Sequence, residues 1–337
     1  MHVTLLVPDL FWPRNDSAPY RGLDLPALAV LLARARRRSF PPTSLEAWLC
    51  KAFEVGRQHD WPVAPMTYEF DGGSPGGDFW LRADPVHLLV SRDRLTLLDP
   101  GILRPSPEES HELVDLLNRQ FAGDGLFFHA PWPERWYLRA PGTPRLATQE
   151  LSQAAGRDVA GALPTGEDSL YWRRTLTEIQ MLLHEHPVNQ RREARGELPI
   201  NSVWLWGGGR RAPVRGQHFS HVAGENSLAL ALAARSGAEA LDNARLPGER
   251  AARVLIAIET PGGRYGDDER WRQALVELER FWCAPLLASL RRRTVEHLAL
   301  VTLHPDGCDR FEVASTDLLK FWRVVRPIRS HVPGGAS

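Results

Sequence analysis

The stretch "HEHPVNQRREARGELPINSVWLWGGGR", residues 184–210, decides how the rest of the sequence is interpreted. Its composition predicts the end of a helix at Pro187, a short charged bridge, a strand at 202–206 and a glycine turn. A strand that runs into glycines lets backbone N–H groups approach a ligand closely. We therefore expect this strand to end at the ligand-binding edge of an α/β sheet.

The composition is that of an ordinary globular protein with no overall excess of positive or negative charge. The chain has 337 residues, 43% of them hydrophobic, and a formal net charge of zero. We therefore expect neither nucleic acid nor a membrane as a partner. The spacing of Cys50, Cys283 and Cys308 argues against a disulfide framework or a cysteine-built metal site. The first residues contain no basic leader, which predicts a cytoplasmic protein.

Four short apolar runs predict strands that are buried on both faces of a sheet. Helical patterns lie between the runs, and the last of these helices is expected to kink near Pro285. Strands that alternate with helices favour an α/β fold with a mainly parallel sheet covered on both sides. The predicted neighbouring strands are residues 2–7, 202–206, 253–259 and 297–303.

The region 75–162 has a different pattern. A hairpin is predicted around residues 91–94, followed by a helix with a capping box formed by Ser106 and Glu109. Further strand material follows the helix, so the region is predicted to be an inserted α+β lobe. The remaining chain, 1–74 and 163–330, is then the α/β core, and 331–337 is a flexible tail.

The opening stretch resembles a segment of the archaeal-type cofactor-independent phosphoglycerate mutases. The chain is also similar to a bacterial branch of this group, the RpfE-type regulatory proteins. The resemblance implies an alkaline-phosphatase-like fold, in which a second lobe is inserted into an α/β core. The matching residues are His186, Pro187, Asn189, Gly196, Pro199, Asn201, Trp204, Leu205, Trp206, Gly207 and Gly209.

The same stretch supplies the candidate ligand-binding residues. Arginine forks bind phosphate or carboxylate, so a small anionic ligand is expected. The alternatives are a solvated arginine face with a plain turn, and a capping role for His186. The candidates are His186, Asn189, Arg191, Arg195, Asn201, Trp206, Gly207 and Gly209.

The resemblance implies two divalent metals and a serine or threonine nucleophile, but the sequence departs from that pattern. Thr43 and Ser44 are the candidate nucleophiles, with an ordinary helix cap as the alternative. Arg264 stands where a histidine is expected, and no aspartate precedes His304. A single reduced metal site for manganese or zinc would consist of Asp9, Glu259 and His304.

Three functions follow from these observations. The first is a phosphoglycerate mutase-like protein, a pseudoenzyme with a degenerate metal centre, that binds a small phosphorylated or carboxylate ligand in a regulatory role. The second is an active metal-dependent phosphomutase or phosphatase with a reduced metal site. The third is a scaffold that binds a protein partner through a tryptophan-rich surface, for which "FWPRND", "PWPERW" and "LLKFWR" are the candidate segments.

Overall fold

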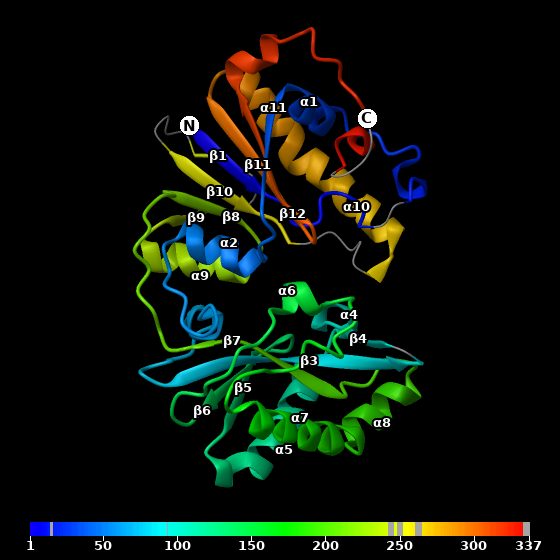
Figure 1. The fold of residues 1–337 in the computed structure, drawn as a ribbon, viewed down its shortest axis with the longest axis vertical. Coiled ribbons are helices and arrows are strands. Elements are labelled where there is room, and N and C mark those ends of the chain that lie inside the picture. Colours follow the sequence, from blue (N-terminus) through cyan, green and yellow to red (C-terminus); the bar gives the residue numbers. More distant parts are fainter. Residues whose placement is uncertain (14–15, 93, 242–245, 248–251, 260–264, 333–337) are drawn as a thin grey trace. The chain divides into compact units, whose positions relative to one another are not determined.

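The computed structural model describes residues 1–13, 16–92, 94–241, 246–247, 252–259 and 265–332 (Figure 1). The chain forms two compact units. Unit 1 comprises Met1–Trp48 and Gly216–Ser337, and unit 2 comprises Leu49–Arg215. The boundaries predicted for the inserted lobe, 75 and 162, both fall inside unit 2.

Unit 1 contains a seven-stranded mixed sheet in the order β2-β12-β11-β1-β10-β8-β9. The five strands from β11 to β9 are parallel, and β12 pairs antiparallel with both β11 and β2. This confirms the predicted α/β fold with a mainly parallel sheet. The strands are β1 (His2–Leu6), β2 (Arg36–Phe40), β8 (His221–Gly224), β9 (Glu239–Leu241), β10 (Arg253–Ala257), β11 (His297–His304) and β12 (Gly307–Ala314).

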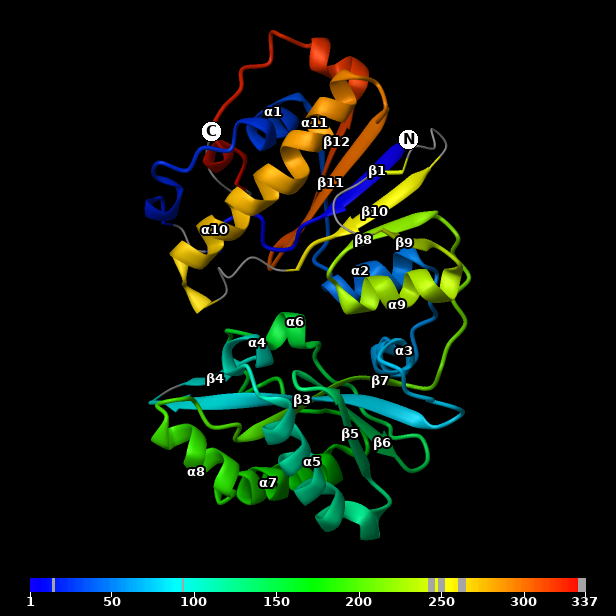
Figure 2. The same ribbon diagram turned by 180° about the vertical axis from the view of Figure 1, so that it is seen from behind.

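Helices pack on the unit 1 sheet because the apolar strand residues need cover on both sides. Three of the helices, α1, α10 and α11, lie together on one face (Figure 2), and α9 packs on β8. The helices are α1 (Pro26–Arg34), α2 (Leu45–Ala52), which begins in unit 1, α9 (Ser227–Ser236), α10 (Asp268–Leu278) and α11 (Ala284–Arg291). Short 3-10 turns occur at η1 (Ala18–Tyr20), η5 (Ser315–Leu319) and η6 (Ile328–His331).

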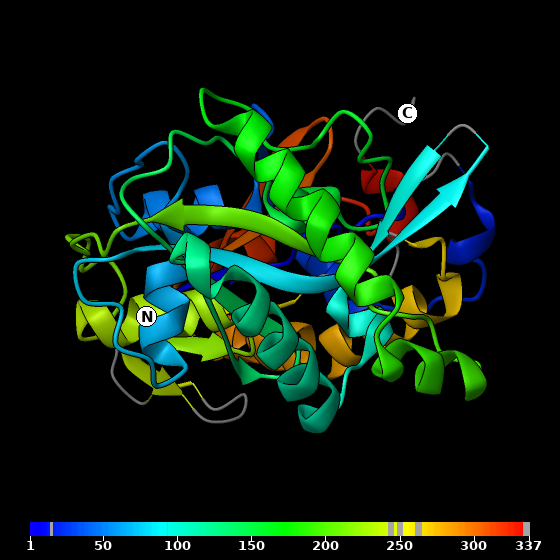
Figure 3. The same ribbon diagram turned by 90° about the horizontal axis from the view of Figure 1, so that it is seen from below.

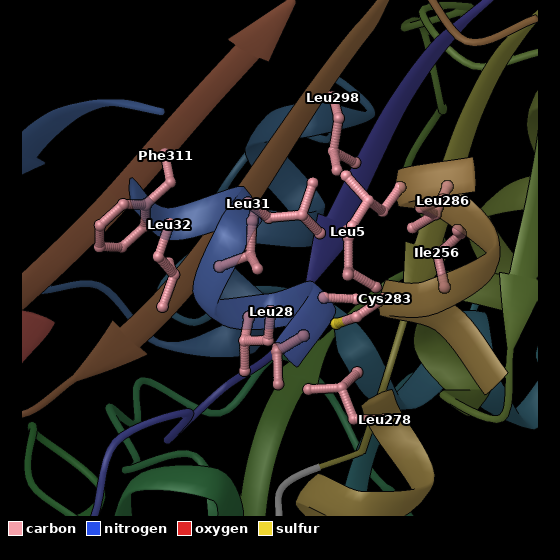
Figure 4. Close-up of a cluster of buried hydrophobic side chains, with 14 of the residues drawn as sticks. Leu5, Leu28, Leu31, Leu32, Ile256, Leu278, Cys283, Leu286, Leu298 and Phe311 are labelled. Carbon is pink, nitrogen blue, oxygen red and sulfur yellow. The ribbon is translucent and has the colours of Figure 1, made fainter. Parts of the chain in front are cut away.

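The unit 1 core lies between these helices and the sheet. Leu28 and Leu31 of α1 point toward Leu5 of the central strand β1, and all three side chains are at most 3% exposed (Figure 4). A π-helical segment, η4 (Glu279–Cys283), precedes Pro285, near which a kink was predicted. Both carboxylate oxygens of Glu279 accept hydrogen bonds from the first backbone N–H groups of α1, at 2.7 and 2.9 Å. The irregular segment therefore caps α1.

Unit 2 contains an antiparallel sheet in the order β4-β3-β6-β5, with β7 paired to β3. The prediction that 202–206 is a neighbouring strand of the main sheet was wrong, because this run belongs to β7. The predicted hairpin is confirmed, since β3 and β4 pair up to Ser91 and Arg94. The strands are β3 (Phe79–Ser91), β4 (Arg94–Leu98), β5 (Phe127–Trp132), β6 (Arg135–Ala140) and β7 (Ser202–Gly209).

Two long helices, α5 and α7, cover one face of the unit 2 sheet (Figure 3). The capping box predicted for α5 is confirmed, because Ser106 and Glu109 each bond the other's backbone N–H. On another part of the sheet, α3 packs Tyr68 against Trp80. The helices are α3 (Val63–Phe70), α4 (Pro100–Leu103), α5 (Pro107–Phe121), α6 (Leu151–Ala154), α7 (Ser169–His184) and α8 (Pro187–Ala194), with a 3-10 turn η2 (Ala122–Asp124).

The charged bridge predicted after Pro187 is the helix α8, so that prediction was wrong. Pro187 ends the pattern of α7, but it also occupies the first turn of α8, where its missing N–H has no cost. Within the part of the chain that the structure describes, no helix is both long and apolar enough to cross a membrane.

Candidate functional site

The carboxyl ends of four unit 1 strands meet at one edge of the sheet. Strands β1, β10 and β11 are parallel, and β2 runs in the same direction because two antiparallel pairings separate it from β11. Asp9, Thr43–Ser44 and Glu259 follow the ends of β1, β2 and β10, and His304 is the last residue of β11. The residues that the sequence assigned to a nucleophile and a metal therefore lie at the same edge.

Asp9 is fixed next to the end of β11. Its backbone N–H donates to the carbonyl oxygen of Leu303 at 2.9 Å, and the N–H of Leu10 donates to Thr302 Oγ1 at 3.2 Å. Asp9 has a φ of 49°, in the left-handed region that aspartate tolerates better than most residues. Asp9 is 7% exposed. The turn after β1 therefore places a buried carboxylate residue beside the strand that ends in His304.

His304 is already paired with a carboxylate. Its Nε2 lies 3.2 Å from Oδ2 of Asp309, a residue of the neighbouring strand β12. Asp309 is 1% exposed, and it also accepts hydrogen bonds from Arg37 at 2.8 and 3.1 Å and from Ser39 at 2.6 Å. Burial acts to raise the pKa of Asp309, but the hydrogen bonds from Arg37 and Ser39 lower that pKa below its ordinary value.

The sequence analysis missed Asp309. The signal that could have found it is the turn "HPDG" at 304–307, which makes a hairpin from β11 and β12 and sets His304 opposite Gly307. Gly307 leaves room for the ring, since a Cβ there would lie 3.3 Å from the His304 ring. The carboxylate partner of His304 therefore comes from the second strand of the hairpin.

Thr43 and Ser44 precede α2 and have different environments. Ser44 Oγ accepts a hydrogen bond from the N–H of Ala47 at 3.0 Å, which is the helix-cap alternative. Thr43 Oγ1 is buried and has no hydrogen-bond partner among the described residues. A buried hydroxyl without a partner is unusual in a folded protein. Thr43 therefore offers a donor at this edge, beside the positive end of α2.

The residues at this edge do not fit a two-metal centre. Glu259 is exposed, and Arg264 lies outside the described residues. Across the described residues, no three histidine, cysteine, aspartate or glutamate side chains are grouped so that they could hold a metal ion. His304 directs a ring nitrogen to Asp309, and two metals would need a larger set of converging ligands.

The opening stretch belongs to unit 2, where its arginines hold α8 in place. Arg192, whose side chain is 2% exposed, donates to Glu109 at 2.5 Å and to the carbonyl oxygens of Leu103 and Leu198 at 2.6 and 2.8 Å. Arg195 pairs with Glu109 at 2.5 Å and with Glu197 at 2.8 Å. Arg192 was also expected to present a forked donor to an anion, but its spacing from the apolar residue Val188 on the same helix is a sign of burial.

Other predicted ligand-binding side chains also make contacts inside unit 2. Arg191 forms an exposed ion pair with Glu112 at 2.7 Å. Asn189 is 2% exposed, and its amide bonds the backbone of Leu183 and Ile200 at 2.7–2.8 Å. These contacts join the end of α7, α8 and the approach to β7. They give Asn189 a structural role, and its contact with a ligand stays a prediction.

Asn201 and His186 bond the backbone of unit 2. Asn201 bonds the N–H and carbonyl of Leu88 at 2.8 and 3.1 Å, which fixes the chain beside β3. His186 Nδ1 accepts the N–H of Val188 at 3.2 Å, so the histidine caps α8, as the alternative interpretation held. Burial lowers the pKa of His186, which keeps that nitrogen available as an acceptor.

Trp206 donates a hydrogen bond to a buried ion pair, Arg82–Asp84, which was not predicted from the sequence. Its Nε1 donates to Asp84 Oδ2 at 2.7 Å, and Asp84 Oδ1 accepts from Arg82 at 2.6 and 3.0 Å. Arg82 and Asp84 are 5% and 0% exposed, and the Arg82 guanidinium lies 5.1 Å from the centres of the Trp206 and Tyr137 rings. Buried charges destabilise a protein unless they are paired and their hydrogen-bonding groups are satisfied.

The glycines after Trp206 make close contacts within unit 2. A Cβ on Gly208 would lie 2.7 Å from Leu81, and one on Gly209 would lie 2.6 Å from Pro62. Gly207 has a φ of +63°. The glycines are therefore required by packing, and the proposed approach of a ligand to Gly207 and Gly209 stays a prediction.

Known proteins are similar to this chain in sequence, and a solved structure is similar to it in fold. It is 26% identical over 248 residues to a 2,3-bisphosphoglycerate-independent phosphoglycerate mutase of Methanothermobacter thermautotrophicus, covering 65% of this chain. It is also 26% identical over 208 residues to a probable enzyme of the same name from Geobacter sulfurreducens, covering 59% of this chain. The chain is related to the cofactor-independent phosphoglycerate mutases. The resemblance seen in the opening stretch is thereby confirmed at the level of the family.

The phosphoglycerate mutase-like chain differs in extent from these relatives. The matches cover 60% and 49% of the two relatives, so the chain spans about half of their length or slightly more. A solved structure of a Pyrococcus horikoshii protein has the same fold, with a TM-score of 0.52 at 14% identity. That alignment covers 93% of this chain and 87% of the other. No protein-family model matches the chain.

Proposed function

We propose that this phosphoglycerate mutase-like protein binds a small phosphorylated or carboxylate ligand at the carboxyl edge of the unit 1 sheet and does not turn it over. One observation carries the proposal. Asp9, Thr43, Ser44 and His304 lie at that edge, but the His304 ring is paired with Asp309 at 3.2 Å. His304 and Ser44 therefore make structural contacts at that edge, whereas Thr43 Oγ1 has no partner among the described residues.

The chemistry of the edge favours an anion. Thr43 offers a buried hydroxyl without a partner among the described residues, and α2 begins two residues later with its positive end at this edge. The names of the relatives supply the ligand class, because phosphoglycerates carry both a phosphate and a carboxylate. A regulatory role in place of turnover is proposed from the resemblance of the sequence to the RpfE-type regulatory proteins.

The alternative is an active metal-dependent phosphomutase or phosphatase. It would need a metal on Asp9, Glu259 and His304, and the described residues include no such three-residue group. We derive no catalytic step through a metal here, because the donor set is too small to hold both the attacking and the leaving oxygen.

Calorimetry on the chelator-treated protein tests the proposal, with 3-phosphoglycerate, 2-phosphoglycerate and inorganic phosphate as probes. We expect saturable binding of at least one probe without added metal. The variant Thr43→Val should lower that affinity about tenfold, because it removes one hydroxyl donor to an anion. The matched control is Thr294→Val, an exposed threonine whose hydroxyl bonds Ser289 in the same unit. Absence of heat with all three probes, or an equal effect of both variants, would overturn the proposal.

A further inference from the structure

The segment 319–326, "LKFWRVVR", exposes large apolar side chains to solvent between η5 and η6 (the red loop in Figure 1). Phe321 is 84% exposed and Trp322 is 66% exposed. Their rings meet edge to face, with centroids 5.4 Å apart. Leu319, Val324 and Val325 are 68%, 72% and 42% exposed. Contiguous exposed apolar side chains of this size mark an interaction surface.

The other aromatic segments singled out in the sequence do not form such a surface. Trp12 and Trp136 are 5% and 0% exposed and belong to the cores. Trp132 is 53% exposed, but the Arg135 guanidinium covers its ring at 5.1 Å from the centroid. Among these three segments, 319–326 is therefore the one that exposes several uncovered apolar side chains.

Contacts on both sides hold the segment in place, so the exposure of its apolar side chains is a property of the fold. Arg323 donates to the carbonyl oxygens of Arg34 and Ala35, at the end of α1, at 3.0 and 2.8 Å. Arg34 donates in return to the carbonyl oxygen of Arg323. Further along, Ile328 is 3% exposed and packs in the unit 1 core. These contacts use the side chains of Arg323, Arg34 and Ile328 and leave those of Phe321 and Trp322 outside.

The charges around the segment specify the kind of partner. Residues 317–332 contain Lys320, Arg323, Arg326 and Arg329 against one acidic residue, Asp317, which pairs with Lys320 at 2.5 Å. A symmetric contact between two copies would place these cations against their own equivalents, which is unfavourable. A surface that combines negative charge with an apolar layer satisfies both the cations and the aromatic side chains. The headgroup region of an anionic lipid bilayer has these two properties.

We propose that the segment 319–326 docks this protein on an anionic lipid surface. Phe321 and Trp322 enter the boundary between headgroups and acyl chains, where aromatic side chains are favoured. Arg326 faces the lipid phosphates, whereas Lys320 is paired with Asp317. The binding is peripheral, in agreement with the lack of a membrane-spanning helix among the described residues. The zero net charge of the chain led us to expect no membrane partner, and this proposal replaces that expectation. Net charge does not decide the matter, because a local group of charges acts within a Debye length of about 8 Å.

Vesicle cosedimentation tests the proposal with defined lipids. One set of vesicles is neutral phosphatidylcholine, and the other contains phosphatidylglycerol in addition. We expect binding to the anionic vesicles, weak binding to the neutral ones, and loss of binding at about 1 M salt, where the Debye length falls to about 3 Å. The double variant Phe321→Ser, Trp322→Ser should weaken binding to anionic vesicles by at least about tenfold.

Two further variants separate docking from folding. Leu170→Ser with Met181→Ser is the matched control, since both side chains are 61% exposed on α7, and it should bind vesicles like the parent. Arg326→Gln leaves the apolar side chains intact and should weaken binding to anionic vesicles about fivefold, from about 1 kcal/mol per cation near the surface. Equal binding to both kinds of vesicle, or none to either, would overturn the proposal. The proposal would also be overturned if light scattering showed that the parent protein is a dimer and that only the double variant Phe321→Ser, Trp322→Ser dissociates it.

Discussion

His304 Nε2 lies 3.2 Å from Asp309 Oδ2 across the hairpin of β11 and β12, and Arg37 donates to the same carboxylate at 2.8 Å. This relationship assigns His304 to a fixed network at the end of its strand. A metal-binding histidine uses the nitrogen lone pair for the ion and often gives its other nitrogen to a carboxylate. Here the contact with Asp309 occupies Nε2. The lack of a three-residue ligand group among the described residues, and not this contact, argues against a two-metal centre.

The variant Asp309→Asn should destabilise unit 1 strongly. Asp309 is 1% exposed and satisfies Arg37, Ser39 and His304, so the amide leaves a partly buried cation without its counter-charge. We expect a loss of about 3 kcal/mol in the free energy of unfolding, measured by urea titration at pH 7. The control Glu312→Gln alters a carboxylate that is 35% exposed on the same strand, and should cost less than about 1 kcal/mol. Equal losses would contradict the account.

The same carboxylate should make stability depend on pH. The pKa of Asp309 in the folded protein is lower than its ordinary value of 3.8. The unfolded chain therefore binds more protons at acidic pH, and the contribution of Asp309 is complete above about pH 5. It is lost as the pH falls from 3.8 toward the folded pKa. The parent should lose more stability than Asp309→Asn between about pH 5 and pH 3, and parallel losses would exclude this role.

A pair of acidic variants tests whether the opening stretch is a structural clamp. Glu109 holds Arg192, whose side chain is 2% exposed, whereas Glu112 holds Arg191, and both of those side chains are 48% exposed. Glu109→Gln should cost about 3 kcal/mol in urea unfolding, because a buried guanidinium loses its charged partner. Glu112→Gln should cost less than about 1 kcal/mol. If the two variants are equally stable, α8 is not held by Arg192.

Asn189→Ala separates the structural role of Asn189 from the predicted ligand contact. The amide makes three buried hydrogen bonds to the backbone of Leu183 and Ile200. Their loss should lower the free energy of unfolding by about 3 kcal/mol, because buried peptide groups remain unpaired. Affinity for the calorimetric probes should stay within about twofold of the parent at a temperature where the variant is folded. A large loss of affinity with little loss of stability would restore the ligand-binding interpretation.

The fold class could be predicted from the sequence, but one strand was assigned to the wrong sheet. The hairpin at Ser91–Arg94 and the capping box of α5 depend on local residues, and both were predicted correctly. Strand β7 is buried along its whole length, because α7 and α3 both pack against it. Its apolar pattern is therefore the same as that of a central parallel strand, and periodicity cannot distinguish the two.

The candidate site was only partly predictable, for a physical reason. Residues that follow strand ends, such as Asp9 and His304, can be placed at one edge once the strands are known to be parallel. Their partners cannot be placed so easily, because Asp309 and Arg37 come from antiparallel neighbours whose register depends on turns. The roles of Arg192 and Asp84 depend on burial of charge, which is decided by tertiary packing.

Two glycine variants test the close packing at the end of β8. Gly224 has a φ of +104°, and a Cβ there would lie 2.1 Å from the carbonyl oxygen of Ala257. Gly224→Ala should therefore cost at least about 3 kcal/mol in the free energy of unfolding. Gly237 has a φ of +78° with open space around it, so Gly237→Ala should cost only about 1 kcal/mol from the strained backbone. Thermal and urea unfolding should rank the two variants in this order.

The central claim is that this edge of the sheet binds an anion but has lost two-metal catalysis. Steady-state phosphoglycerate mutase turnover of the manganese-supplemented protein, with metal content measured on the same sample, tests it most directly. We predict turnover far below the ordinary enzyme range of about 1–1000 per second, and less than one tightly bound metal ion per chain. Turnover within that range, abolished by a chelator and restored by manganese, would contradict the claim.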